Sequence, residues 1–280
     1  MDFFKKPLII LALTLAALPM RGLAQYQFTV DPFFSYFRDA GRYEIGGNYI
    51  LANGEYDGVA RAIDGFGNFA GDTTLKRKIT GTGVGGFIGI SVPIKATGHI
   101  SCWAAHFELQ ANQYSWTDLN KTYSNGNFTN VKPALNASTL QVALPIGIEW
   151  KIGCDAIESK RLNFATALGA GVIPAFSMTS LENTTGFNSM SSFGFTPYVK
   201  AEGTVFLGIA VKVRVMYTLG DVRMLEVDRA VPNGVTDGPF RIVSNSDLIL
   251  SFIIMPFSGH WSESAWWNTH DTYNKHDRLN

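Results

Sequence analysis

Residues 140–152, LQVALPIGIEWKI, decide the fold because two kinds of side chain alternate along them. The even positions are all apolar, from Leu140 to Ile152, whereas the odd positions carry small, polar or charged residues such as Glu149 and Lys151. A helix would scatter these apolar residues around its axis, but a strand places them all on one face. The stretch therefore predicts a β-strand with one apolar face and one polar face.

The connections between strands of this kind point to the architecture. Short and long connections alternate along the chain, and the long ones are rich in Asn, Gly, Ser, Thr and Asp. A soluble β-sandwich would mix its loop lengths, whereas an outer-membrane barrel has short periplasmic turns and longer outer loops. We therefore predict an all-β fold, a closed antiparallel up-and-down transmembrane β-barrel of about eight strands. The strands are expected near 43–51, 80–92, 103–112, 140–152, 162–178, 195–205, 209–219 and 248–254, the short turns at 93–97, 153–160 and 206–208, and the long loops at 52–78, 117–137, 179–193 and 220–245.

A ten-stranded barrel is the alternative. Residues 26–37 also alternate, and pairing them with 43–51 as a hairpin would add strands to the ring. Eight strands are preferred because ten would disturb the alternation of short and long connections, and eight leave both ends of the wall on the periplasmic side.

Composition agrees with a barrel better than with a soluble globule. Only 16% of the residues are charged, against about 25% in typical domains. The 28 glycines and the 13% of aromatic residues suit turns, small inward positions and interfacial rings. The formal net charge is zero, and no basic surface points to nucleic acid.

The N-terminus has the pattern of a secretory signal peptide. Lys5 and Lys6 form a basic start, an apolar stretch follows over residues 8–18, and small residues lead to Ala24, after which cleavage is expected. The apolar stretch is too short to cross a bilayer, which needs about 20 residues. The expected organisation is a signal peptide at 1–24, an outer-membrane barrel at 25–257 and a periplasmic tail at 258–280.

TLQVALPIGIEWKIG at 139–153, ALGAGVIPAF at 167–176 and VKVRVMYTLGD at 211–221 resemble three strands of a known family, the outer-membrane β-barrel domain proteins widespread in Bacteroidota. The resemblance covers about residues 26–257. It implies a small porin-like barrel in the outer membrane of a Gram-negative bacterium and brings no catalytic residues. Barrels of this type usually end on an aromatic residue that the assembly machinery reads. Here Phe257 is the equivalent, although further residues follow it.

The polar face of each strand would fill the lumen of such a barrel, and four acids face four bases there. An eight-stranded barrel has an interior just wide enough for side chains, and a buried charge without a partner is costly. We expect an internal salt-bridge network, the alternative being a narrow ion path lined by the same groups. The eight residues are Glu44, Glu108, Glu149, Glu202, Lys151, Lys200, Lys212 and Arg214.

Four glycines lie on the inner face of the strand expected around residues 79–92. The segment GTGVGG superficially resembles a phosphate-binding loop, but such a loop needs a helix N-terminus directly after it, and an alternating strand follows here. We interpret the glycines as making room for bulky neighbours in the lumen. They are Gly81, Gly83, Gly85 and Gly89.

Cys102 and Cys154 fall near the same periplasmic rim on neighbouring strands, in a compartment that permits oxidation. Cys102 points inward by parity, whereas Cys154 would point outward if its strand extended that far. Bridged cross-strand residues must share a face. A disulfide therefore forms only if Gly153 already begins the turn, and both outcomes stay open.

A lipid-modifying enzyme is a further alternative. His99 and Ser101 resemble the His-x-Ser of outer-membrane lipid A deacylases, in which histidine acts as base for serine and a glutamate orients it. Position 111, where that glutamate could fall, is Ala111, and Glu108 faces inward by parity. His99 also lies by a short turn, away from the outer leaflet. We expect no enzyme, and lipid modification is the weakest alternative.

The tail at 258–280 contains three histidines, which could bind a metal, but no rigid element fixes their geometry. A mobile periplasmic tail whose tryptophans rest at the membrane interface is the preferred interpretation. No metal and no cofactor are expected. These residues are His260, His270, His276, Trp261, Trp266 and Trp267.

The sequence thus predicts a structural or interaction barrel in the outer membrane. Its partners would be outer-membrane lipid, the barrel assembly machinery and an extracellular ligand held by the long loops. A narrow transport barrel for a small or apolar solute is the alternative.

Overall fold

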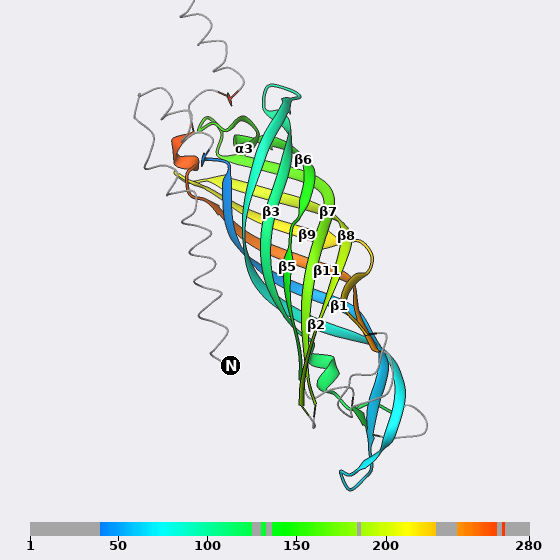
Figure 1. The fold of residues 1–280 in the computed structure, drawn as a ribbon. Helices are drawn as coiled ribbons and strands as arrows, with labels where there is room; N and C mark the ends of the chain where they lie inside the picture. Colours follow the sequence, from blue (N-terminus) through cyan, green and yellow to red (C-terminus); the bar gives the residue numbers. More distant parts are fainter. Residues whose placement is uncertain are drawn as a thin grey trace, which may run out of the picture.

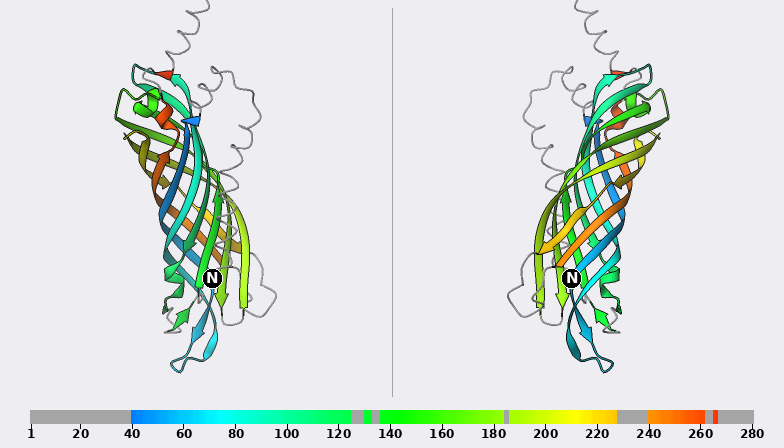
Figure 2. Two further views of the ribbon diagram at one scale, coloured as in Figure 1. Left: turned by 90° about the vertical axis from the view of Figure 1, so that its left-hand side faces the viewer. Right: turned by 90° about the vertical axis from the view of Figure 1, so that its right-hand side faces the viewer.

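The computed structural model describes residues 40–124, 130–132, 136–183, 186–227, 240–261 and 265–266. The predicted signal peptide and the alternating segment 26–37 lie outside the described residues. The strands wind side by side into one tilted cylinder (Figure 1), whose slanted wall is clear from two further sides in Figure 2.

Eight antiparallel wall segments close the ring, which confirms the predicted fold class and strand number. Seven of them are single strands, and the eighth consists of two half-strands, β5 and β6, that share the neighbours β3 and β7. The ring closes where β1 pairs with β11. The wall consists of β1 (Tyr43–Ile63), β2 (Phe69–Ala96), β3 (Ser101–Ser115), β5 (Asn136–Ala143), β6 (Ile146–Gly153), β7 (Phe164–Asn183), β8 (Gly186–Phe206), β9 (Ala210–Thr218) and β11 (Phe240–Met255).

The break between β5 and β6 falls at Leu144 and Pro145, in the middle of the stretch that first indicated the fold. Proline has no N–H to donate to a neighbouring strand. The N–H of Leu144 donates to the carbonyl of Pro174 at 2.9 Å, and the N–H of Glu108 donates to the carbonyl of Pro145 at 3.0 Å. The wall therefore stays hydrogen-bonded on both sides of the break.

The outward face of the wall is apolar. On β9, Val213, Val215 and Tyr217 are exposed, whereas Lys212 and Arg214 between them are fully buried. Soluble monomers rarely expose contiguous apolar patches larger than a few hundred Å², but such a belt around a closed sheet suits contact with hydrocarbon. Exposed members on the other strands include Tyr49, Leu51, Trp103, Phe107, Ile148, Trp150, Leu168, Val172, Phe195, Val199, Leu250 and Phe252.

Two of the four connections predicted to be long loops are continuations of the wall. Residues 52–78 belong almost entirely to β1 and β2, which pair to a turn at residues 64–68, and residues 179–193 belong mostly to β7 and β8. A strand that crosses a bilayer needs only about 9–11 residues, so the remainder projects outside the membrane. The arm formed by β1 and β2 is the blue and cyan hairpin at the lower end of the barrel in Figure 1.

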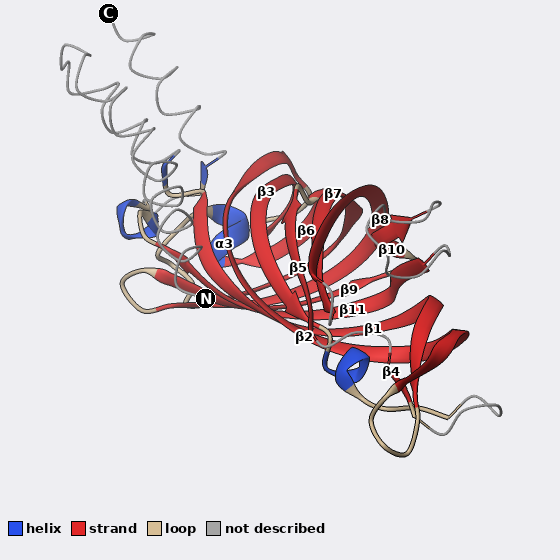
Figure 3. Cartoon of the chain, turned by 60° about the horizontal axis from the view of Figure 1, so that its bottom comes forward, coloured by secondary structure: helices blue, strands red, loops and turns tan. Residues whose placement is uncertain are grey.

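The other two long connections contain short elements. Residues 117–137 include a 3₁₀ helix, η1, and a short strand, β4, which pairs with β1; residues 220–245 include β10, which pairs with β11. Figure 3 shows η1 and β4 beside the arm at the outer end of the ring. Their bounds are η1 (Thr117–Asn120), β4 (Val131–Lys132) and β10 (Val222–Val227).

The end of the barrel that carries the short turns is the one expected to be periplasmic and is called the periplasmic end here. It is closed by short elements that the sequence pattern did not indicate. The turn predicted at 153–160 contains a helix, α3 (Cys154–Ile157), and the last strand ends at Met255, two residues before Phe257. A 3₁₀ helix, η2 (Ser258–His260), follows it. No helix among the described residues is long and apolar enough to span a membrane.

The start of the predicted mobile tail is packed against this end, which corrects that expectation for the described part of it. Trp261 is only 2% exposed and stacks on Phe206 at a ring separation of 5.8 Å. It packs with Cys154 and Met255 because the chain turns back across the mouth of the barrel after β11. The Nε1–H of Trp266 donates to a carbonyl of α3 at 3.0 Å. Trp267, His270 and His276 lie outside the described residues.

Candidate functional site: the filled lumen

Glycine on the inward face allows bulky side chains to fit inside the narrow ring. A Cβ added at Gly81 would lie 2.8 Å from the ring of Trp116, and one added at Gly83 would lie 3.2 Å from Ile50. At Gly85 it would meet the backbone carbonyl of the neighbouring strand at 2.5 Å. The inner face of β2 is thus a smooth surface against which larger lumen residues pack.

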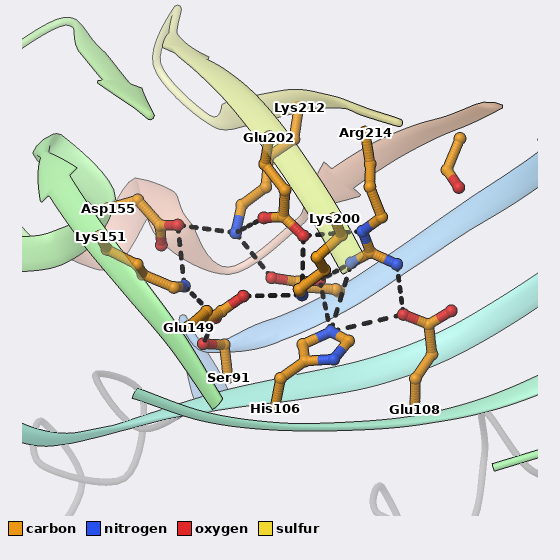
Figure 4. Close-up of polar contacts among 12 residues, drawn as sticks. Ser91, His106, Glu108, Glu149, Lys151, Asp155, Lys200, Glu202, Lys212 and Arg214 are labelled. Atoms are coloured by element: carbon orange, nitrogen blue, oxygen red, sulfur yellow. Dashed lines mark hydrogen bonds and ion pairs between the residues drawn. The ribbon is translucent and has the colours of Figure 1, made fainter. Parts of the chain in front are cut away.

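Arg214 is the centre of an ionic network in the periplasmic half of the lumen (Figure 4). Its Nε donates to Glu202 at 2.7 Å, its Nη2 donates to Glu44 at 2.9 Å, and its Nη1 donates to Glu108. The guanidinium carbon also lies 5.0 Å from the centre of the Phe87 ring. One cation therefore joins carboxylates from β1, β3 and β8, because the planar guanidinium presents several donors in fixed directions.

Three lysines complete the network around these carboxylates. The Nζ of Lys212 lies 2.6 Å from Glu44, and the Nζ of Lys200 lies 2.7 Å from Glu149 and 2.9 Å from Glu202. Lys151 lies 3.0 Å from Glu149. The structure thus brings together all eight residues named from the sequence, and each of them is at most 5% exposed.

Two members of the network were not named from the sequence. Asp155, on α3, accepts from Lys151 at 2.8 Å and from Lys212 at 2.7 Å. Its position in a turn gives no strand parity from which its inward direction could be inferred. The Nε2 of His106 lies 3.2 Å from Nη2 of Arg214. His106 does occupy an inward position on its strand, so parity alone could have included it.

The same cluster contains three groups with the chemistry of metal ligands. Atoms of Glu44, His106 and Glu108 lie within 4.8 Å of one another. The guanidinium of Arg214 already donates to both carboxylates, so a cation occupies the place between them. A metal ion would have to displace Arg214, and the residues therefore fit a protein ion pair better than a metal site.

The network continues outward as a column of amides and hydroxyls. Gln110 donates to Glu108, Asn112 donates to Gln110 at 3.0 Å, and Asn48 donates to Asn112 at 3.2 Å. Ser251 donates to Asn48 at 2.8 Å. This column thus consists of neutral side chains that are hydrogen-bonded one to the next.

A mainly apolar lid closes the outer half above this column. The rings of Tyr114 and Trp116 stack at a separation of 6.1 Å, and the Nε1–H of Trp116 donates to Thr139 at 3.0 Å. Both side chains are at most 1% exposed. The other members of this lid include Tyr56, Leu75, Ile79, Leu119 and Val131.

An outer lobe is built from the arm, η1 and β4. Asp118 of η1 accepts from both the backbone N–H and the hydroxyl of Thr80 at 2.7 Å, and Tyr123 donates to the carbonyl of Asp118 at 2.6 Å. At the tip of the arm, Asp64 accepts from the backbone N–H of Phe66 at 2.9 Å, and Phe66 is 92% exposed. Side-chain hydrogen bonds therefore hold this lobe in shape outside the membrane.

The two cysteines are free thiols, so the disulfide considered for Cys102 and Cys154 is not formed. The strand ends at Gly153, but the next residue starts α3, which directs the thiol of Cys154 into the apolar cluster with Met255 and Trp261. Both thiols are buried. Burial raises the pKa of Cys154 to about 12.

The residues considered for lipid modification are not arranged as a catalytic pair in the described chain. The hydroxyl of Ser101 is 3.0 Å from that of Thr97, while His99 is exposed on the same periplasmic turn. Glu108 is committed to the lumen network. This end of the barrel carries Trp103 and Trp150 in register across neighbouring strands, as expected at a membrane interface.

Comparison with known proteins gives matches in fold only. No family model matches the chain, and no curated protein matches it. Among solved structures, it is similar to the outer membrane protein OprG from Pseudomonas aeruginosa, with 13% identity, 76% of this chain and 94% of that chain covered, and a TM-score of 0.40. It is also similar to the outer membrane protease OmpT from Escherichia coli, with 8% identity, 75% and 96% covered, and a TM-score of 0.34.

Neisserial surface protein A is a further similar structure, with 10% identity, coverage of 75% of this chain and 99% of that chain, and a TM-score of 0.28. Likeness at this level carries no statement about activity. The closed ring and its apolar belt are features of this chain itself, and they are the architecture of transmembrane barrels. The chain is an outer-membrane β-barrel protein.

Proposed function

We propose that this protein is a non-conducting barrel of the structural or interaction type, which anchors an ordered outer lobe in the outer membrane. The observation that carries the proposal is the filled lumen. Five carboxylates, three lysines and one arginine are joined by ion pairs across it. In an eight-stranded ring such side chains occupy the available interior.

Both ends of the lumen add to the obstruction. The lid around Trp116 and Leu119 covers the outer end, and α3 with Trp261 covers the periplasmic end. An ion that entered would have to separate buried pairs, and a buried charge that loses its partner is destabilised by about 3–5 kcal/mol. This cost argues against the alternative of a narrow transport path.

The outer lobe supports an interaction role. Loops on a rigid scaffold are where such proteins carry recognition, and here the arm is braced by Asp118, Thr80 and β4. The ring of Phe66 at the tip of the arm is 92% exposed and is thus accessible to a ligand. We propose that an extracellular ligand meets this lobe, and the proposal assigns no catalytic step to the protein.

Two further partners are expected of a barrel in the outer membrane. We propose contact with outer-membrane lipid through the belt, and insertion by the barrel assembly machinery, with Phe257 as the aromatic residue that it reads. We also propose that the protein is Bacteroidota-like, exported by cleavage after Ala24. The three segments quoted from the sequence support this origin.

Planar-bilayer recording tests the closed lumen. Purified protein inserted in a bilayer should give no steady conductance steps, and Lys212→Met and Glu149→Gln should not create an ion-selective pathway. Stable steps in the wild type whose size or selectivity changes with either substitution would show instead that the lumen conducts.

Loop variants test the interaction role separately. One variant shortens the arm by replacing residues 64–68 with Asn-Gly, a favoured two-residue hairpin turn. Another replaces residues 117–135 with a short Gly-Ser linker, which leaves β3 and β5 intact. The readout is attachment of expressing cells to one another and to a surface, with heat-modifiable gel mobility as the control for folding. Attachment should fall while the barrel still folds; unchanged attachment in both variants would contradict the proposal.

A further inference from the structure

A small polar cavity lies in the lumen between the ionic network and the outer lid. The space open to the centre of a water molecule is about 10 Å³, and a cavity holds a water when this measure reaches about 10–15 Å³. There is thus room for one water molecule and for no organic solute. The polar residues that line it are Gln110, Tyr114, Gln141, Thr196, Thr218 and Asp247.

The cavity lies beside an irregular interval of the wall, between β9 and β10. The last β8–β9 pair is Tyr198 with Thr218, and the last β9–β11 pair is Tyr217 with Leu248. Beyond this point β9 no longer separates β8 from β11. β10 pairs with β11 from Val222 and Ser244 onward, so Thr196 of β8 and Asp247 of β11 line the cavity beside the interval between β9 and β10.

Both of these side chains have unused hydrogen-bonding capacity. Thr196 is 1% exposed, and its hydroxyl has no hydrogen-bond partner among the residues that the structure describes. A buried hydroxyl without a hydrogen-bond partner destabilises the folded state. Asp247 accepts from Ser244 and, at 3.2 Å, from Tyr114, and a carboxylate can accept about four hydrogen bonds.

We infer that the cavity is a binding site for one ordered water molecule, which bonds to the Thr196 hydroxyl and donates to the Asp247 carboxylate. The water joins β8 to β11 in the short interval between the last pairs of β9 and the first pair of β10. Polar cavities of this size hold waters with two to four partners. A monovalent cation is disfavoured because it would have to shed its hydration shell for one carboxylate that already accepts two hydrogen bonds.

A crystal structure at about 1.5 Å resolution, grown in the presence of rubidium chloride, tests the site. The expected result is a peak within hydrogen-bond distance of Thr196 Oγ1 and of an Asp247 carboxylate oxygen, without anomalous signal at the rubidium edge. An anomalous peak would show a cation site, and an empty cavity would show a dry one. Either result overturns the inference.

Variants sharpen the same test and are independent of whether the barrel conducts or binds a ligand. Thr196→Val should lose the peak, and Thr196→Ser should keep it. Thr204→Val is the matched control, because Thr204 is a buried inward residue of β8 that does not line the cavity. A peak that survives in Thr196→Val would show that Thr196 does not hold the water.

Discussion

The two halves of the lumen are filled by side chains of opposite chemistry. The periplasmic half is filled by charged groups around Arg214, and the outer half is closed by the largely apolar lid around Trp116. Charges in the first half depend on one another, because loss of one leaves its partners unpaired. Side chains in the second half lose only their own contacts. The comparison predicts that single substitutions in the ionic half are the more damaging.

The largest effect is expected for Arg214→Met. The substitution leaves Glu44, Glu108 and Glu202 without their shared partner, and we expect the free energy of unfolding to fall by about 4 kcal/mol. Urea titration in detergent micelles, with gel mobility as the readout of folding, measures this free energy of unfolding. Arg241→Met is the control: its pair with Asp221 is exposed and 3.9 Å long, so a change below about 1 kcal/mol is expected. Equal effects would remove the distinction between buried and exposed pairs.

Trp116→Ala should rank second, with a loss of about 3 kcal/mol from the cavity that it leaves. Conductance should stay absent, because the ionic half still blocks the lumen. The same urea titration, together with bilayer recording, measures both properties. Trp103→Ala serves as the control, since Trp103 is 44% exposed on the outer surface of the wall. Steps that appear with Trp116→Ala alone would mean that the lid, rather than the network, closes the barrel.

Gly147→Ala tests how tightly the wall and the lumen fit. The new Cβ would lie 2.5 Å from the Tyr198 hydroxyl and 2.5 Å from the carbonyl of Ala170, and overpacking of this kind costs about 1–3 kcal/mol. Gly203→Ala has nothing within 4 Å of its new Cβ and should be close to neutral. The difference between the two urea midpoints is the measurement, and equal midpoints would argue that the lumen side is loosely packed.

The smallest effect is expected in the outer lobe, from the titration of Asp118. Hydrogen bonds from Lys121 and Thr80 lower the pKa of Asp118 below its usual value. The stabilisation is therefore complete above the unfolded pKa, about 3.9, and is lost as the pH falls through the folded pKa. Its size should stay below about 1 kcal/mol, because the pair is at the surface.

Hydrogen exchange of the lobe amides checks this titration. Protection around Thr80 should be constant from pH 5 to 8 once the intrinsic rate is corrected, and it should decrease below about pH 4. Asp118→Asn should be less protected at neutral pH and should lack this acid-dependent decrease. The same acid-dependent decrease in the variant would assign the effect to another carboxylate.

The alternation of residues along the strands predicted which side chains of the wall point outward and which point into the lumen. The alternation at 140–152 assigned Glu149 and Lys151 inward, and the same rule assigned Lys212 and Arg214; all four are buried in the structure. The reason is local, since successive side chains of a strand point to opposite faces wherever the strand lies. The same alternation also places His106 on the inward face of its strand.

Other features have no such local signal. Asp155 enters the network because α3 turns it toward Lys212, and a turn has no period that would reveal this. The extent of β1 and β2 was underestimated because Gly, Asn and Asp recur along residues 52–78, and these residues are typical of loops. Their strand conformation comes from pairing along the hairpin and from bracing by η1.

The amino-acid sequence by itself determined the class of wall, its apolar outer face and the charges that point inward, because these depend on a period of two along each strand. Tertiary structure alone decided which acid meets which base, that Cys102 and Cys154 stay apart, and that Trp261 closes one mouth. Those outcomes depend on where the ring closes and on how the chain turns between strands, which brings together residues as distant as Glu44 and Lys212.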